Sequence, residues 1–219
     1  MDKRLALILT LTLLTGCILA GPDTPLRRAS GEGDLAAMTA LLDGGADPDA
    51  PGAYGMTPLA AAARAGRVDA LDLLVARGAN PHKGCGVNGW TPLLHALHKN
   101  QMEAAIRLID TAAQPSAELD DALFMASGYA EAQAVDALLA KGADPRKERG
   151  DGANALSSAV AGAFDIDYTY RGCPDHTAVV RDLLQHAPDL KLEGAAGAKA
   201  RRAAERRGCS EMLALLDRG

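Results

Sequence analysis

Two small groups of side chains are of the types that bind metals or carry out acid–base chemistry. His95 and His98 stand three residues apart, which places both imidazoles on one face of a helix, but no third ligand accompanies them. The other group does not have the spacing of an EF-hand loop and consists of Asp165, Asp167, Asp175 and His176. We therefore expect a helical surface pair of histidines, a solvated acidic loop, and no bound metal or cofactor.

Motifs of the main catalytic classes are missing from the sequence. It contains no GxxxxGK[ST] phosphate loop, no HExxH zinc helix and no GxSxG nucleophile elbow. We name no catalytic residue and predict a protein that is not an enzyme. An enzyme, or a small-ligand or metal-binding protein that uses the insertion described below, is the alternative of a different class.

The composition favours close-packed helices. Of the 219 residues 48% are hydrophobic but only 3% are aromatic, so alanine and leucine supply most of the apolar surface. Small apolar residues suit close-packed helices better than sheets, which favour β-branched and aromatic residues. The formal charge of −5 lacks the basic balance of a nucleic-acid-binding domain, so we exclude a nucleic-acid partner.

The N-terminal segment is typical of an export signal. Lys3 and Arg4 precede an apolar run over residues 5–14, which is shorter than the roughly 20 residues of a membrane-spanning helix. The following Leu14-Thr15-Gly16-Cys17 resembles the lipobox of bacterial lipoproteins. The alternative is an ordinary signal with a chance cysteine. It would require small residues before the cleavage site, where this chain has Ile18 or Leu19.

The lipobox resemblance implies a protein anchored in the bacterial cell envelope. Residues 1–16 would be removed as a signal peptide, Cys17 would carry the lipid, and residues 17–23 would form a short tether. Ile18 follows the cysteine where an Asp would favour retention in the inner membrane. We therefore expect a periplasm-facing protein in the outer membrane.

The rest of the chain is built from internal repeats. The triplet Thr24-Pro25-Leu26 recurs at Thr57 and at Thr91, with spacings of 33 and 34 residues. The decayed triplets that start at Asp121 and Asn154 keep the same phase. A second marker, Gly-Ala-Asp/Asn-Pro, begins 21 residues after the triplet in the first, second and fourth repeats.

This pattern resembles the ankyrin repeat over residues 24–219. The resemblance implies an all-α solenoid of about six helix-turn-helix repeats with short hairpin fingers, starting near residues 24, 57, 91, 121, 154 and 199. The third repeat is shortened before Asp121, so we expect its finger to be reduced to a loop. The fifth carries an insertion at about residues 163–176.

Individual residues of the repeats also have local physical roles. Thr57 can cap a helix, Pro58 suits its first turn, and Gly66 permits a tight turn between two helices. Charged residues at both ends of the array predict polar caps that face water. They are Arg27 and Arg28 in the first repeat, and Arg201, Arg202, Glu205, Arg206 and Arg207 in the last.

In proteins with ankyrin repeats, the partner usually contacts the concave face formed by the fingers and first helices. Transferred to this chain, the larger side chains at those positions are Tyr54, Met56, Arg64, Asn88, Trp90, His98, Lys99, Asp120 and Tyr129. Tyr168 and Tyr170 of the insertion are added because aromatic residues are common in binding hot spots. The alternative is that these rings pack on neighbouring parts of the same chain.

The leading functional prediction is a monomeric, envelope-tethered protein that binds another protein. One version is an immunity protein that neutralises a toxin in the periplasm. A second version is an accessory factor for a periplasmic enzyme, for example one of oxidative defence. The sequence does not separate these versions, and it does not identify the partner.

Three cysteines remain after Cys17, and export exposes them to an oxidising compartment. By repeat phase, Cys173 and Cys209 fall on the same edge of adjacent repeats, whereas Cys85 falls on a finger. We therefore predict a disulfide between Cys173 and Cys209 and a free Cys85. Three free thiols are the alternative.

Overall fold

The computed structural model describes residues 23–86, 88–111, 115–162 and 172–217. These residues form 12 α-helices and one 3-10 turn, and none of them belongs to a strand. The prediction of an all-α fold is therefore confirmed.

The chain divides into two compact units, residues 1–96 and 97–219, with the boundary inside helix α6. The first unit contains α2 (Pro25–Glu32), α3 (Leu35–Asp43), the 3-10 turn η1 (Ala53–Gly55), α4 (Pro58–Arg64), α5 (Val68–Ala76) and the start of α6 (Pro92–His98). The second contains α7 (Met102–Thr111), α8 (Ser116–Gly128), α9 (Ala132–Ala140), α10 (Ala155–Ala161), α11 (Cys173–His186), α12 (Gly194–Arg207) and α13 (Ser210–Leu216).

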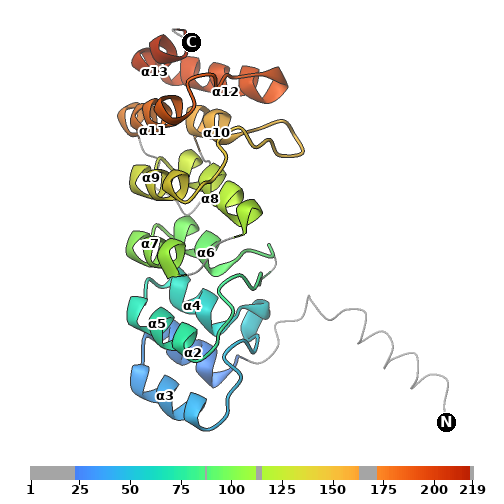
Figure 1. The fold of residues 1–219 in the computed structure, drawn as a ribbon, viewed down its shortest axis with the longest axis vertical. Helices are drawn as coiled ribbons and strands as arrows, with labels where there is room; N and C mark the ends of the chain where they lie inside the picture. The colour runs from blue at the N-terminus through green and yellow to red at the C-terminus, as the bar shows by residue number, and fades with distance from the viewer. Residues whose placement is uncertain (1–22, 87, 112–114, 163–171, 218–219) are drawn as a thin grey trace, which may run out of the picture. The chain divides into compact units, whose positions relative to one another are not determined.

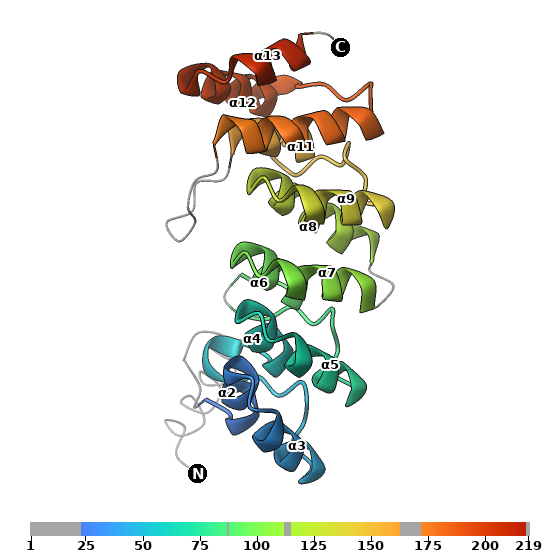
Figure 2. The ribbon, with the colours of Figure 1, turned by 90° about the vertical axis from the view of Figure 1, so that its left-hand side faces the viewer.

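Within each unit, helix pairs stack in two rows (Figures 1 and 2). In the first unit α2 packs on α4 and α3 packs on α5. In the second unit α8, α10 and α12 form one row, and α7, α9, α11 and α13 form the other. This is the arrangement that a repeat of two short helices produces, because a single pair cannot bury its apolar face alone.

In four repeats the first helix begins directly after the first residue of the triplet, which is Thr24, Thr57, Thr91 or Asn154. The side-chain oxygen of Thr24 accepts a hydrogen bond from the Arg27 amide at 3.3 Å, and that of Thr57 accepts one from the Ala60 amide at 3.2 Å. Asn154 replaces the threonine in the fifth repeat and forms a reciprocal capping box with Ser157. Such caps satisfy amides that have no partner within the helix.

The core of each unit consists of alanine and leucine side chains. In the first unit Leu59, Leu71 and Leu74 are fully buried, and in the second Leu123 and Leu156 are. Small residues such as Ala62 and Ala63 are buried between the stacked helices. Because their side chains are short, the helix backbones can approach closely.

Two first helices begin earlier than the repeat phase indicates. Helix α8 begins at Ser116 rather than near Asp121, and α12 begins at Gly194 rather than near Lys199. Neither repeat has a Thr-Pro pair that would fix the start, so helix-favouring residues upstream extend the helix. In the fifth repeat α11 already begins at Cys173, so the end of the predicted insertion is helical, and residues 163–171 lie outside the described residues.

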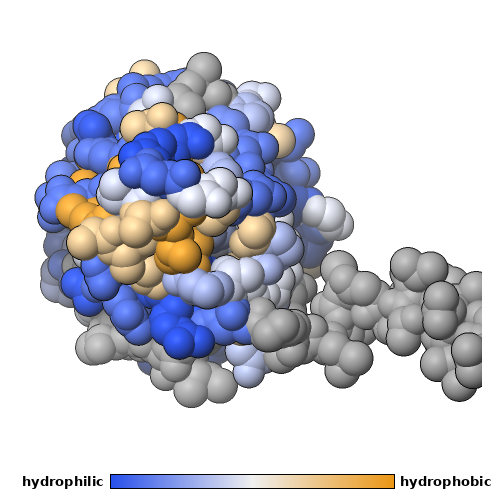
Figure 3. Space-filling model, turned by 90° about the horizontal axis from the view of Figure 1, so that it is seen from below, coloured by the Kyte–Doolittle hydropathy of each residue, from blue (hydrophilic) through white to orange (hydrophobic). Residues whose placement is uncertain are grey.

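The start of the first unit presents both apolar and charged residues. On α3, at the start of the first unit, only Met38 is buried, and the exposed residues include Leu35, whose exposed fraction is 39%. Figure 3 shows a hydrophobic patch at this end, bordered by hydrophilic residues. Of the two arginines predicted to face water here, Arg28 is exposed, whereas Arg27 is half-buried and pairs with Asp23.

A tight turn with positive φ joins the two helices of most repeats. Its residue is Gly33, Gly66 or Gly208 in three repeats, and Asn100 or Ala130 in two others. We expect Gly66→Ala to lower the free energy of unfolding by about 1 kcal/mol, because a Cβ is disfavoured at its φ of 69°. Urea unfolding followed by Trp90 fluorescence measures this.

The control is Gly31→Ala, inside helix α2. A Cβ at Gly31 would meet the Ala61 side chain at an ordinary 3.8 Å, so this change should leave stability unchanged or raise it by up to about 1 kcal/mol. Equal losses from both substitutions would contradict the assigned role of the Gly66 backbone.

Candidate partner-binding surface

In the first unit short fingers connect consecutive repeats, and a backbone hydrogen bond closes each of them. The Gly52 amide donates to the Met56 carbonyl at 2.9 Å, and the Cys85 amide donates to the Trp90 carbonyl at 2.9 Å. The Gly86 amide also donates to the Gly55 carbonyl at 3.4 Å, which connects the two fingers of the first unit. Tyr54 and Trp90 therefore lie on neighbouring, hydrogen-bonded fingers.

Tyr54 is the most exposed large apolar residue among those described. Its exposed fraction is 69%, and its φ of 57° lies in the left-handed region. A non-glycine residue in this region is uncommon and costs conformational energy, so the turn must be held by its surroundings. The result is a phenol ring presented to solvent at the tip of the finger.

The second finger carries the tryptophan. Trp90 is half-buried and meets the His95 imidazole edge-on, with ring centroids 5.7 Å apart and planes inclined by 66°. This contact fixes one part of the indole and leaves the rest accessible. Of the other predicted residues in this unit, Asn88 is exposed, and Met56 and Arg64 are half-buried.

In the second unit, two predicted contact residues are buried against each other. The exposed fractions of His98 and Tyr129 are 8% and 7%, and His98 Nδ1 lies 2.9 Å from the Tyr129 hydroxyl. The prediction that these rings contact a partner is therefore wrong: they pack within their own unit. A buried imidazole and a buried phenol satisfy each other's polar atoms, which explains why both are polar residues in a core.

The remaining predicted positions fall into two groups. Lys99 and Asp120 are half-buried, and the Asp120 carboxylate accepts a hydrogen bond from the Asp144 amide at 2.8 Å. Asp120 therefore stabilises the next loop in addition to any role at a surface. Tyr168 and Tyr170 lie outside the described residues.

An ion pair at the start of the first unit was not predicted from the sequence. The Asp23 carboxylate accepts two hydrogen bonds from the Arg27 guanidinium. The hydrogen bonds and positive charge of Arg27, with a smaller contribution from a hydrogen bond from the Ala53 backbone, lower the pKa of Asp23 to about 2. Because Asp23 thereby contacts the residue next to Tyr54, it helps to position the first finger.

Gly52 is required for the contact of Asp23 and Arg27 with the first finger. A Cβ at Gly52 would lie only 2.7 Å from Arg27 Cδ and 2.9 Å from an Asp23 carboxylate oxygen. The only signal in the sequence for the Asp23–Arg27 ion pair is the spacing of four residues between an Asp and an Arg. That spacing is too common to identify the pair.

The candidate metal and acid groups do not assemble into a site in the part that the structure describes. His95 and His98 are buried rather than on the surface, which corrects that expectation. His176 Nδ1 lies 2.9 Å from the Ala159 carbonyl, and Asp165 and Asp167 lie outside the described residues. Residues 23–86, 88–111, 115–162 and 172–217 contain no cluster of three or more potential metal ligands.

Cys173 and Cys209 are joined by a disulfide, with their Cα atoms 5.4 Å apart. Cys173 begins α11, and Cys209 stands just before α13, so the bond links the fifth repeat to the last one.

Cys85 is a buried free thiol close to the Thr57 hydroxyl, and burial raises its pKa. Within the described part of the chain, no helix has the length and apolar character needed to span a bilayer.

Comparisons with known proteins agree with this architecture. A family model described as ankyrin repeats (3 copies) matches residues 8–85. A 75-residue stretch is 43% identical to the 2-5A-dependent ribonuclease of Mus musculus, covering 34% of this chain but only 10% of that protein.

Two solved structures match most of the chain at 22% identity. One is a chain from the complex of the predatory endopeptidase Bd0816 of Bdellovibrio bacteriovorus with the immunity protein Bd3460; the TM-score is 0.67, over 88% of this chain and 98% of that one. The other is an ankyrin repeat domain from Acinetobacter baumannii AYE, with a TM-score of 0.71 over 88% of this chain and 95% of that one. The chain therefore has the all-α ankyrin-repeat fold, and residues 8–85 match the ankyrin-repeat family model.

Proposed function

We propose that this protein is an envelope-tethered binding module that contacts a protein partner through the fingers of its first unit. The observation that supports this most directly is the exposed ring of Tyr54, held at a finger tip by a backbone conformation that tyrosine rarely adopts. A costly conformation that exposes an aromatic ring is better explained by recognition than by stability.

Other residues extend the proposed contact surface. Trp90 lies on the adjacent finger, Met56 and Asn88 belong to the same two fingers, and Arg64 ends α4, so these three add apolar, amide and cationic groups. Aromatic side chains bury large areas with few rotatable bonds, and tryptophan, tyrosine and arginine dominate binding hot spots. Ankyrin repeats are binding scaffolds in general, which agrees with a non-enzymatic role.

The lipobox supports a tether to the bacterial envelope, facing the periplasm and most consistent with the outer membrane. We expect Cys17→Ser to move the protein from the membrane fraction to the soluble fraction, because two or three acyl chains anchor firmly and an unlipidated chain has no such anchor. Fractionation followed by immunoblotting measures this. Retention of the variant in the membrane fraction would rule out lipid anchoring at Cys17.

The partner that we favour is a toxin, so that the protein acts as an immunity protein. The observation behind this choice is the fold shared with a chain from the endopeptidase–immunity protein complex. An accessory factor for a periplasmic enzyme, such as one of oxidative defence, remains the second candidate. The protein, tethered to a support, is used to capture partners from envelope extracts, with a Tyr54→Ala variant as the control. The identity of the protein that binds the unmodified surface but not the variant distinguishes a toxin from a periplasmic enzyme.

A further inference from the structure

Helix α12, which belongs to the same row as α8 and α10, is strongly basic although the protein as a whole is acidic. Its sequence GAAGAKARRAAERR contains five cationic side chains and one carboxylate, whereas the whole chain carries −5. The sequence alone suggests a solvated cap, in which all of these charges simply face water. The structure divides them into two groups.

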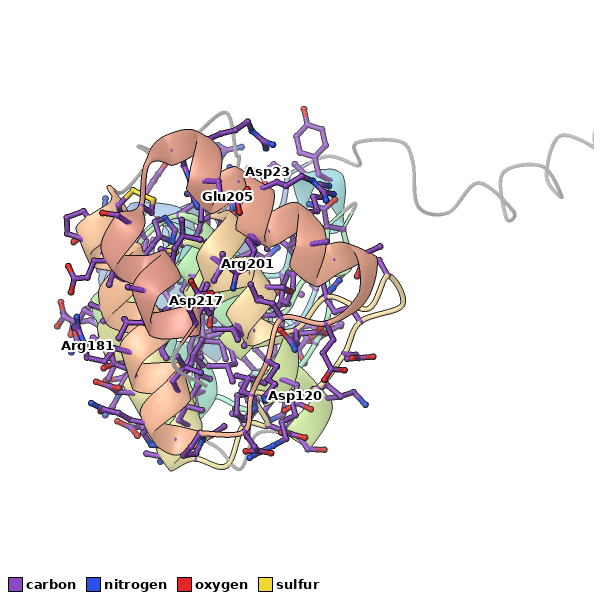
Figure 4. All side chains as sticks on the ribbon, turned by 90° about the horizontal axis from the view of Figure 1, so that it is seen from above. Asp23, Asp120, Arg181, Arg201, Glu205 and Asp217 are labelled. Atoms are coloured by element: carbon purple, nitrogen blue, oxygen red, sulfur yellow. A yellow bond between two sulfur atoms is a disulfide. The ribbon has the colours of Figure 1, made fainter. Side chains whose placement is uncertain are left out.

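Two of the arginines have structural partners. Arg201 donates to the Asp217 carboxylate at 2.8 Å and so joins α12 to α13; Figure 4 labels both residues. Arg207 donates to the carbonyl oxygens of Val160 and Ala203, which connects the end of α12 to α10. These two cations hold the last repeat in place.

The other three cations are exposed and form no ion pair with any residue that the structure describes. They are Lys199, Arg202 and Arg206. At 100° per residue they fall within about 60° of one another on the helix, on the side away from the buried Gly197, Ala200 and Ala204. The helix dipole explains a cation in the last turn, such as Arg206, but it does not explain Lys199 or Arg202.

We propose that this basic stripe, Lys199, Arg202 and Arg206, binds an acidic helix of the protein partner. The proposal rests on the binding function proposed above and specifies the partner's chemistry. The stripe extends for about 10 Å along the axis, with steps of three and four residues. A partner helix that carries Glu or Asp at the same steps presents its carboxylates at matching intervals, and arginine binds carboxylates in a bidentate manner.

The surroundings of the stripe favour a narrow acidic segment over an anionic membrane. Ala195 and Ala198 are small and exposed beside it, which leaves room for a second helix to approach. Glu205, labelled in Figure 4, and Glu193 lie on or next to the same helix and would repel a broad anionic surface. A single row of carboxylates can contact the stripe without approaching Glu205 or Glu193.

The test uses the full chain and two fluorescent peptides of identical length. One is a helical peptide with Glu at steps of three and four residues, and the other carries Gln at those positions. We expect the protein to bind the Glu peptide, and the charge reversal K199E/R202E/R206E to weaken binding by about tenfold or more. Added salt should weaken binding to the unmodified protein, because the charges are exposed.

The matched control changes three exposed lysines elsewhere in the same unit, K141E/K147E/K191E. It alters the net charge equally and should bind the Glu peptide at least several times more tightly than the stripe variant. The neutral variant K199Q/R202Q/R206Q, checked by thermal unfolding, separates loss of charge from loss of folding. The proposal is overturned if the Gln peptide binds equally well, if the control variant loses as much affinity, or if vesicles with anionic headgroups bind more tightly than the peptide. A partner that is captured through Tyr54 equally well by the stripe variant would leave the proposed function intact and reject only the stripe.

Discussion

Removal of the Cys173–Cys209 disulfide is expected to lower the free energy of unfolding of the second unit by about 2–4 kcal/mol. The bond closes a loop with a sequence separation of 36, which restricts the unfolded chain. In the folded state it joins the start of α11 to the turn before α13 and so holds the helix pair α12 and α13 against the fifth repeat. The double variant Cys173→Ser/Cys209→Ser should therefore lose α12 and α13 first.

Hydrogen exchange of α12 and α13, with and without reductant, measures this effect directly. Cys85→Ser is the control, because Cys85 is buried in the first unit beside Thr57 and takes no part in the bond. Peptide mapping under non-reducing conditions checks the pairing in protein purified from the periplasm. Three alkylatable thiols, a linkage that contains Cys85, or exchange rates that reductant leaves unchanged would each contradict the account.

The repeat phase predicted where most first helices begin because its markers have local physical roles. Thr57 caps α4 and Pro58 occupies its first turn, so the position of the helix follows from the residues themselves. Gly33, Gly66 and Gly208 likewise mark turns whose positive φ excludes most other residues. Where such markers are missing, as before α8 and α12, the helix starts shifted upstream.

The candidate site was less predictable because burial depends on side chains that are distant in sequence. Position within the repeat indicated that His98 and Tyr129 face a partner, but each is the hydrogen-bonding partner of the other across 31 residues. The Asp23–Arg27 pair could not be predicted from the sequence for a related reason. Its importance comes from Gly52 and Ala53, which approach it only in the folded unit.

The second large effect is expected at the fingers of the first unit. Tyr54→Ala and Trp90→Ala should each weaken partner binding by about 2 kcal/mol, as aromatic hot-spot residues do. Tyr54→Ala should leave stability almost unchanged, because its ring is mostly exposed. Trp90→Ala also removes the edge-on contact with His95, so Trp90→Phe, which keeps an aromatic ring, is the companion variant.

Leu35→Ala is the matched control for a change of exposed apolar surface. Leu35 is the other exposed large apolar residue among those described, and it lies on α3 rather than on a finger. Titration of the captured partner by calorimetry should give the same affinity for Leu35→Ala as for the unmodified protein. Equal weakening by Leu35→Ala and Tyr54→Ala would show that the effect does not depend on the finger surface.

The central claim, that the fingers of the first unit contact a protein in the envelope, is tested most directly by photo-crosslinking in the cells that produce the protein. A photoreactive phenylalanine analogue replaces Tyr54 in one strain and Leu35 in another. We predict a single major protein adduct at position 54 that is absent at position 35, and that disappears when Trp90→Ala is added. Adducts of equal yield at both positions, or no adduct at position 54 in cells that contain the partner, would contradict the account.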